Sequence, residues 1–225
     1  PDSTDYNGGN YQDRYKVLAE IRKALEQGNR QKAKQLAEEN LVGPNNAQYG
    51  RYLSFGDIFM VFNNQKKGLE NVTDYHRDLD ITEAITTTSY SQDGTNFKRE
   101  TFSSYPDDVT VTHLSKKGDK TLDFTLWNSL TEDLRANGDY SWEYSKYKQG
   151  AVTTDSNGIL LKGTVKDNGL QFASYLGIKT DGQVTAQDGY LTVTGASYAT
   201  LLLSAKTNFA QNPKTNYRKD IDLEK

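Results

Sequence analysis

Paired carboxylates are the residues of this chain whose types and spacing are best suited to chemistry. Asp78 and Asp80 stand two positions apart in a segment of alternating character, so on a strand both side chains share one face. Glu100 follows Arg99 in a second such segment. Two carboxyl groups flanking a glycosidic bond are the minimum for its hydrolysis, one to protonate the leaving oxygen and one to activate water or attack the sugar. Arg77 and Arg99 favour a simpler interpretation, in which ion pairs on a sheet face explain all three acids.

Other chemistries lack the residues that they require. The chain has no cysteine, which excludes disulfides, thiol catalysis and zinc bound through cysteine. Its two histidines, His76 and His113, have no companion at metal-ligand spacing, and no glycine-rich loop of the phosphate-binding type is present. No serine lies in the Gly-x-Ser-x-Gly pattern of an acyl-transfer nucleophile. We therefore expect neither a metal site nor a cofactor.

An aromatic segment offers a different kind of site. Between residues 128 and 149 the periodicity breaks, and Trp142 stands there among three tyrosines. Trp and Tyr rings pack against the apolar faces of sugars, so Trp142 is a candidate substrate-binding residue. The simpler interpretation is that these aromatic side chains anchor a long loop to a sheet or to a neighbouring domain.

The elements that must position these residues begin with a helical hairpin. Over residues 13–27, apolar side chains recur on one face at helical spacing, and Gly28 follows as the closing residue. Asn29 is placed to cap a second helix, which Gly43 and Pro44 end. Apolar stripes of this kind normally pack on a core, so we expect the pair to cover one end of a sheet.

From Phe55 onward, apolar and polar residues alternate, which indicates strands separated by turn dipeptides such as Asp93-Gly94. Residues 75–81 are expected to pair with the strand that starts at Phe97. The other expected strands cover residues 58–62, 84–90, 97–103, 109–114, 122–126, 159–165, 170–179, 191–194 and 200–206. No helix of crossover length intervenes, which argues against a parallel sheet. The prediction is a mainly β fold, with a large antiparallel β-sandwich over residues 51–225 and a helical lead-in over residues 1–50, together one domain.

Composition excludes several partners. The chain has 225 residues, a formal net charge of −3 and an isoelectric point near 5.5, so it lacks the basic excess of a nucleic-acid-binding protein. Mean hydropathy is −0.81, and no apolar run approaches the roughly 20 residues that a membrane helix needs. We expect neither a nucleic acid nor a membrane as partner. The 15 tyrosines and 8 phenylalanines supply aromatic area for a sheet core.

Several segments also carry the residue order of a known family. The relevant runs are Tyr-His-Arg-Asp-Leu-Asp from Tyr75, Arg-Glu-x-Phe-x-Ser-x-Pro from Arg99, Tyr-x-x-x-Gly-Asp from Tyr52 and Thr-Asn-Phe from Thr207. Taken in chain order, from Tyr52 to Thr207, they resemble the N-terminal domain of glycoside hydrolase family 95. That family is known for α-L-fucosidases that act on terminal α-1,2-linked fucose. The similarity runs along nearly the whole chain.

The resemblance implies a super-sandwich of the galactose-mutarotase type. Members of the family are several times longer and carry catalysis in an α/α toroid after this domain. We therefore expect the chain to be a fragment that begins within the family domain and lacks the toroid. No position matches the family's catalytic residues, so none is assigned, and the isolated fragment is expected to be inactive. Asn208, at the end of a predicted strand, is a candidate for a loop that reaches the rim of the fucose pocket.

Three hypotheses of function follow. In the first, this non-catalytic domain packs on the catalytic toroid of the same parent chain, which binds fucosylated oligosaccharides. In the second, it is a carbohydrate-binding or adhesion module that recognises host glycans through Trp127, Trp142 and nearby tyrosines. In the third, it is a hydrolase that uses Asp78, Asp80 or Glu100. Family habit favours a secreted or cell-surface bacterial parent, with cytoplasmic cleavage of imported oligosaccharides as the alternative.

Overall fold

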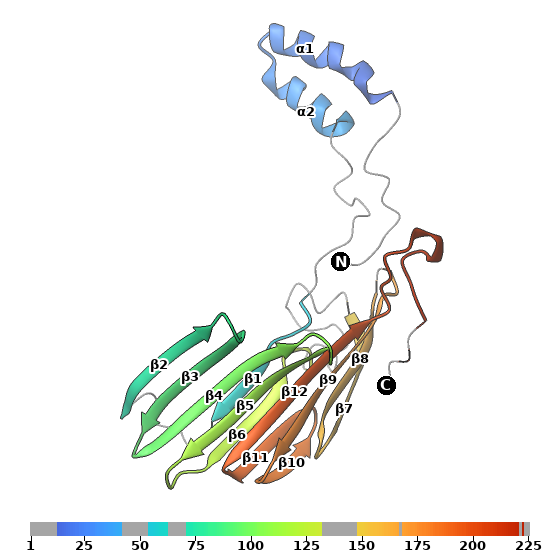
Figure 1. Ribbon diagram of the computed structural model, residues 1–225. Coiled ribbons are helices and arrows are strands. Elements are labelled where there is room, and N and C mark those ends of the chain that lie inside the picture. The colour runs from blue at the N-terminus through green and yellow to red at the C-terminus, as the bar shows by residue number, and fades with distance from the viewer. Residues whose placement is uncertain are drawn as a thin grey trace. The chain divides into compact units, whose positions relative to one another are not determined.

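The computed structural model describes residues 13–41, 54–62, 71–131, 148–166, 168–220 and 222. The chain divides into two compact units, Pro1–Tyr52 and Leu53–Lys225. The first contains the helices and the second contains the strands (Figure 1).

The N-terminal unit is a helical hairpin. A 3₁₀ turn, η1 (Arg14–Val17), leads into α1 (Leu18–Glu26), and α2 (Arg30–Asn40) follows after a short turn. The side chain of Asn29 accepts a hydrogen bond from the backbone N–H of Lys32 at 3.1 Å, which confirms the predicted cap. Ala24 and Ala33 are the buried residues of the two helices, so small side chains let the helices approach closely. Within the described residues, no helix has the length and apolar character that crossing a membrane requires.

The second unit is an antiparallel sandwich of two unequal sheets, as expected. The smaller sheet has the order β1-β6-β11-β10 and the larger has the order β2-β3-β4-β5-β12-β9-β8-β7. The strands of the smaller sheet are β1 (Ile58–Phe62), β6 (Leu122–Asn128), β11 (Tyr190–Ala196) and β10 (Gln183–Gln187). Those of the larger are β2 (Val72–Asp80), β3 (Ile85–Gln92), β4 (Thr95–Ser104), β5 (Val109–Lys117), β12 (Tyr198–Thr207), β9 (Gln171–Thr180), β8 (Gly158–Val165) and β7 (Lys148–Asp155).

One apolar core lies between the sheets. In β6, buried and half-buried side chains alternate along the whole strand, so the strand has one inward and one outward face. Its inward residues Phe124 and Leu126 are fully buried. They belong to one cluster with Leu191 of the smaller sheet and with Ile159 and Leu176 of the larger sheet. This shared core is what makes the two sheets a single sandwich.

The turn dipeptides connect neighbouring strands as predicted. Asp93 and Gly94 have φ values of 47° and 79°, and the flanking Gln92 and Thr95 are paired, which defines a two-residue turn of type I′. One pairing prediction is wrong, however. The strand that contains residues 75–81 does not pair with the strand that starts near Phe97, because β3 lies between them.

The sheets differ in width, which leaves part of the larger one without a facing sheet. At one end, β10 lies against β7 and β11 lies against β8. Four strands therefore face eight, and β1 ends the smaller sheet while the larger one continues through β4, β3 and β2 (Figure 1). The inner face of this overhanging part is bordered by β1.

The Asp181 carboxylate links two connections of the chain, β9–β10 and β11–β12. In both, the chain passes from one sheet to the other. Asp181, directly after β9, accepts hydrogen bonds from the backbone N–H groups of Ser197 and Tyr198 at 2.8 and 3.1 Å, and from the Ser197 hydroxyl. The Ser197 hydroxyl first, and the Tyr198 N–H second, lower the pKa of Asp181 below its ordinary value of 3.8. Folding is thus coupled to ionisation of this group.

We expect the effect of Asp181→Asn on stability to depend on pH in the acid range. Because the folded pKa is depressed, the carboxylate stabilises the fold fully above its unfolded pKa, near 3.8, and this contribution is lost as the pH falls through the lower folded pKa. Urea unfolding of both proteins across a pH series measures it. The gap between them should be constant near neutral pH and shrink below pH 3.8. A gap that persists into the most acidic buffer would contradict the assignment.

Candidate functional site

The three candidate carboxylates lie on the outer face of the larger sheet or at its turns. Asp78 and Glu100 lie in one cross-strand row, with Thr87 between them. One oxygen of Asp80 accepts hydrogen bonds from two backbone N–H groups of the β2–β3 turn, at 2.8 and 3.1 Å. Glu100 forms an ion pair with Lys98 at 2.8 Å. Asp80 and Glu100 therefore have structural partners, and the three acids do not converge on one concave site.

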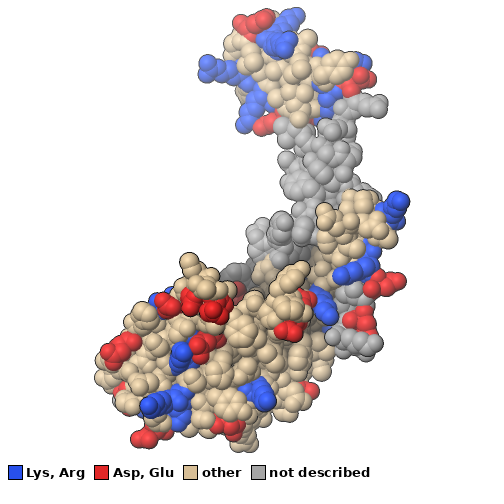
Figure 2. Space-filling model, viewed as in Figure 1, with Lys and Arg blue, Asp and Glu red and all other residues tan. Residues whose placement is uncertain are grey.

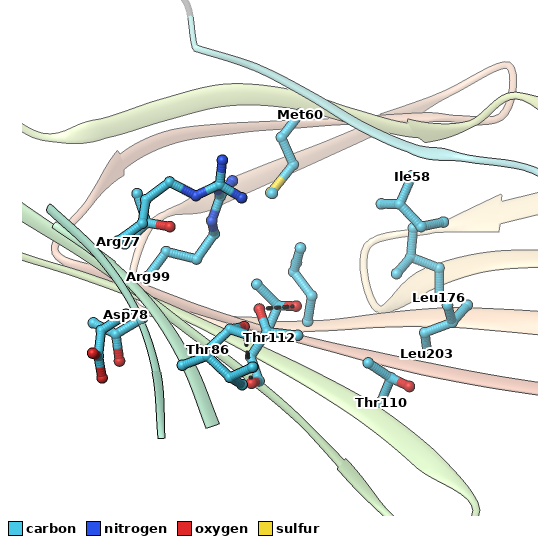
Figure 3. A pocket seen from close by; sticks show the side chains of 15 residues that line it. Ile58, Met60, Arg77, Asp78, Thr86, Arg99, Thr110, Thr112, Leu176 and Leu203 are labelled. Atoms are coloured by element: carbon cyan, nitrogen blue, oxygen red, sulfur yellow. Dashed lines mark hydrogen bonds between the residues drawn. The ribbon is translucent and has the colours of Figure 1, made fainter. Parts of the chain in front are cut away.

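The two arginines face the opposite side of the sheet. Arg77 pairs with Thr88, and Thr88 pairs with Arg99, so both arginines lie in one row of the inner face. Figure 3 shows their guanidinium groups directed toward Met60, with Asp78 directed away from them. The predicted ion pairs between arginines and carboxylates do not form, because consecutive strand residues point to opposite faces. Within the described part of the chain, neither arginine has an ion-pair or hydrogen-bond partner.

The arginines border a hollow of about 550 Å³ on the inner face of the overhang. Its floor is a row of threonines, in which the hydroxyls of Thr101 and Thr112 are 3.1 Å apart and the Thr86 hydroxyl donates to the Thr101 carbonyl at 3.2 Å. Its wall is β1, through Ile58 and Met60. The hollow thus combines a hydroxyl-lined floor, an aliphatic wall and two cationic groups.

A second hollow of about 300 Å³ continues the first. It shares Met60 and Arg99 with the first and adds Phe62 of β1. Tyr90 and Phe97, stacked with ring centroids 5.3 Å apart, form its other side. The two hollows follow the inner edge of β1 along its length.

Asn208, the predicted substrate contact, is buried and bonded within the domain. Its side-chain oxygen accepts from the backbone N–H of Gln171 at 3.0 Å, and its own N–H donates to the Gln171 carbonyl at 3.1 Å. The Asn208 carbonyl accepts from Lys219 at 2.9 Å. Asn208 therefore holds the end of β12, the start of β9 and the C-terminal segment together. Contact with a substrate stays a prediction for this residue.

We expect Asn208→Ala to lower the free energy of unfolding by about 1 kcal/mol, because it removes the acceptor of a partly buried hydrogen bond from the Gln171 N–H. Chemical denaturation measures the loss. Asn208→Asp is the matched control, since it keeps an acceptor oxygen at the same position. Equal stability of the alanine variant and the parent would show that these hydrogen bonds contribute nothing.

The aromatic candidates fall into two groups. Trp142 lies outside the described residues. Trp127, on the outer face of the smaller sheet, stacks on Phe59 with ring centroids 5.2 Å apart and contacts Tyr190 at 5.6 Å. Phe59 and Tyr190 were not predicted from the sequence, since only the register of β1, β6 and β11 brings them beside Trp127. The result is a row of three aromatic side chains across three strands.

Among the described residues, neither a cluster of charge nor a group of metal-binding side chains indicates a further site. On the face seen in Figure 2, acidic and basic side chains are interspersed over the sandwich among uncharged ones. The Nδ1 atom of His113 lies 2.9 Å from the Thr200 hydroxyl, which accounts for one of its two ring nitrogens. In the described ranges, no group of three or more His, Asp or Glu residues is arranged to hold a metal ion.

Comparison with known proteins identifies the kind of domain. Residues 2–212 match the family model described as Glycosyl hydrolase family 65, N-terminal domain. A curated relative, Alpha-L-fucosidase 2 of Arabidopsis thaliana, is 25% identical over 86% of this chain and 24% of its own length. The chain therefore spans about a quarter of that relative.

Among solved structures, one similar chain is described as "Putative kojibiose phosphorylase from human microbiome". It is 12% identical, with a TM-score of 0.46, over 71% of this chain and 23% of the other. The family model extends over all of the described strands, and it agrees with the motifs in assigning the N-terminal domain of a glycoside hydrolase, although its family is 65 where the motifs suggested 95. The chain belongs to the family of glycosyl hydrolase family 65 N-terminal domains.

Proposed function

We propose that the chain is the non-catalytic N-terminal domain of a family 95 glycoside hydrolase, an α-1,2-L-fucosidase. In this role it packs on the catalytic toroid of the same parent chain and completes it, and the parent binds fucosylated oligosaccharides. The family match and the fucosidase relative support the class of parent. The structural observation that carries the packing role is an exposed apolar strip on the outer face of the larger sheet.

This strip crosses four strands. Phe102 pairs with Val111, and Val111 pairs with Leu202, so the three form one row. Tyr175 of β9 lies next to this row, and Phe102, Leu202 and Tyr175 are 39%, 40% and 42% exposed. Contiguous exposed apolar surface of this kind marks interaction sites on soluble domains. Burial, and then the nearby charge of Asp155, raises the pKa of Tyr175, so its hydroxyl is a neutral hydrogen-bond donor beside the strip.

The placement of the carboxylates supports a non-catalytic role. Asp80 closes a turn and Glu100 is paired with Lys98, whereas glycoside hydrolysis requires two carboxyl groups that face one bond. Glycans with terminal fucose lie mostly outside cells, which favours a secreted or cell-surface parent, and cytoplasmic cleavage of imported oligosaccharides is the alternative.

The proposal is tested in two steps with 2′-fucosyllactose and NMR detection of free fucose. The chain itself should release none. In a longer protein that carries the catalytic region, Leu202→Asp should lower fucose release while the isolated variant chain still folds, because a charge in the strip opposes packing. Ile81→Asp, at an exposed turn position outside the strip, is the control. Fucose release by the chain alone, or full activity of the Leu202 variant, would refute the proposal.

The aromatic row favours a second candidate, a carbohydrate-binding module. Phe59, Trp127 and Tyr190 present neighbouring rings on the outer face of the smaller sheet, and Phe59 is 43% exposed. Saturation-transfer NMR on the isolated chain with a glycan panel tests it. Binding that Trp127→Ala abolishes and Phe102→Ala leaves intact would support this module. An absence of saturation transfer to every glycan would exclude it.

A further inference from the structure

The free edge of β1 is unlike the other sheet edges. All five residues of β1 are large and apolar, namely Ile58, Phe59, Met60, Val61 and Phe62, and none is charged. Natural edge strands are usually short, charged, interrupted by proline or covered, because an exposed apolar edge invites pairing with another chain. Among the described strands, only β6 pairs with β1, so no described strand lies beside its other edge.

The remaining edges have the expected protection. The edge strand β2 carries three aspartates, one arginine and one histidine, and nearly all of its residues are exposed. The edge strands β7 and β10 each contain one valine and one alanine among glycine, polar or charged residues. The absence of such protection at β1 indicates that this edge is normally paired.

The surface beside that edge is also incomplete. The inner face of β2, β3 and β4 continues past β1 with no facing strand among the described residues. Two hollows of about 550 and 300 Å³ occupy this gap and follow β1. Sheets in a sandwich pack about 10 Å apart, so one additional strand beside β1 would cover both hollows.

The arginines define the chemistry of that strand. Arg77 and Arg99 point into the gap and have no partner in the described part of the chain. A guanidinium that is covered by apolar groups without an anion loses hydration with no compensation. The covering strand must therefore carry a carboxylate on its inward face, where the planar guanidinium forms two parallel hydrogen bonds.

We propose that the free edge of β1 binds an extended strand of a partner polypeptide, which continues the smaller sheet over β4 and β3 and places a carboxylate against Arg77 and Arg99. Aliphatic side chains next to that carboxylate fill the space beside Met60 and Phe62. Backbone hydrogen bonds to β1 supply affinity, and the arginines select an acidic residue. The proposal does not depend on the hydrolase assignment.

A second copy of this chain does not fit the same edge by antiparallel pairing. Two β1 strands paired antiparallel, about a two-fold axis perpendicular to the sheet, would form one continuous small sheet. Each overhanging β2–β4 region would then enter the layer that β5 and β12 of the other copy already fill. The partner is thus a strand without a second sandwich behind it.

The test uses tethering, for which the absence of native cysteine is convenient. Val61→Cys introduces one thiol on the outward side of β1, away from the hollows. The probe is the peptide TVKITEKVT, whose valines, isoleucine and glutamate share one face, with cysteine at the third, fifth or seventh position to sample registers. In a glutathione buffer, the equilibrium fraction of mixed disulfide reports the non-covalent contacts. We expect about tenfold more capture of this peptide than of a scrambled one, and slower amide exchange in β1.

Matched variants separate the parts of the proposal. Arg99→Gln should lower capture of the glutamate peptide about tenfold and leave that of its glutamine analogue unchanged, since a charge-assisted hydrogen bond is lost. Lys206→Gln makes the same change of charge on an exposed residue of β12 and should have no effect. A peptide N-methylated at the positions that face β1 should not be captured above the scrambled level.

Three results would overturn the proposal. Equal capture of the N-methylated peptide would show that the hollow accepts an acid without strand pairing. Equal capture of the designed and scrambled peptides would show that the edge has no preference for a strand. Slow amide exchange along both edges of β1 in the chain alone would show that the chain already covers this edge itself.

Discussion

Phe124→Ala is expected to lower the free energy of unfolding by about 3 to 5 kcal/mol, because it removes a large, fully buried ring from the core. Phe124 is 0% exposed, lies on the inward face of β6 and stands between the two sheets. Its ring is 5.4 Å from that of Phe62 in the neighbouring strand. Alanine leaves a cavity that both sheets line, and paired strands on either side prevent β6 from moving to fill it. Urea denaturation monitored by circular dichroism measures the loss.

Phe102→Ala is the matched control for that experiment. It removes the same ring from the outer face of the larger sheet, where Phe102 is 39% exposed. Its effect should be well under half that of Phe124→Ala, because less apolar surface returns to water. Similar losses for the two variants would mean that the region between the sheets is not the dominant core.

Gly56→Ala is expected to lower the free energy of unfolding by about 3 kcal/mol, through steric overlap and backbone strain together. The φ of Gly56 is +97°, which L side chains rarely adopt, and an added Cβ would lie 2.0 Å from Oδ1 of Asn128. Asn128 is buried, and the same oxygen accepts the backbone N–H of Leu130 at 2.8 Å. The side chain of Asn128 has therefore no room to retreat without losing that hydrogen bond.

Gly94→Ala separates the two causes. Gly94 also has a positive φ, +79°, but an added Cβ would meet nothing within 4 Å. We expect a loss of about 1 kcal/mol there, from backbone strain alone. Thermal melts of both variants measure the difference. A Gly56 variant no weaker than the Gly94 variant would show that the close approach to Asn128 is easily relieved.

The Gly56 result also bears on one sequence motif. In the Tyr-x-x-x-Gly-Asp run, Asp57 exchanges hydrogen bonds with Ser129, whose hydroxyl accepts from the Asp57 N–H at 2.9 Å and whose own N–H donates to the Asp57 carbonyl at 2.9 Å. Gly56 and Asp57 together join the start of β1 to the end of β6. The part of the motif that the structure describes therefore has a clear role in folding.

The alternation of apolar and polar residues predicted most strands, but not which strands pair with one another. Alternation placed β1 at residues 58–62, as the structure has it, and the Asp93-Gly94 dipeptide marked a true hairpin turn. Two strands, β7 and β10, were missed. Each has only one valine and one alanine, so neither has the alternating large side chains that reveal a half-buried strand. Their pairing with β8 and β11 supplies the stabilisation that their own side chains lack.

The candidate site was harder to predict than the strands. The sequence shows Arg77 and Arg99 beside acids, and pairing with those acids was the natural expectation. Two facts prevent this pairing. Neighbouring residues of a strand point to opposite faces, and β3 lies between β2 and β4, so that both arginines lie in one row of the inner face. Similarly, the sequence groups Trp127 with Trp142 and nearby tyrosines, whereas Phe59 and Tyr190 are distant in sequence and only the sheet order brings them beside Trp127.

The position of β12 has a consequence for biosynthesis. This strand, Tyr198–Thr207, is the last of the described strands to be made, yet it lies in the middle of the larger sheet and pairs with both β5 and β9. Until it leaves the ribosome, the strands β2 to β5 and the strands β7 to β9 are two separate ribbons with two unpaired edges. A nascent chain in that state is a natural client for chaperones, because unpaired edges are sites of misassembly. Joining these ribbons through β12 thus completes the larger sheet from its described strands.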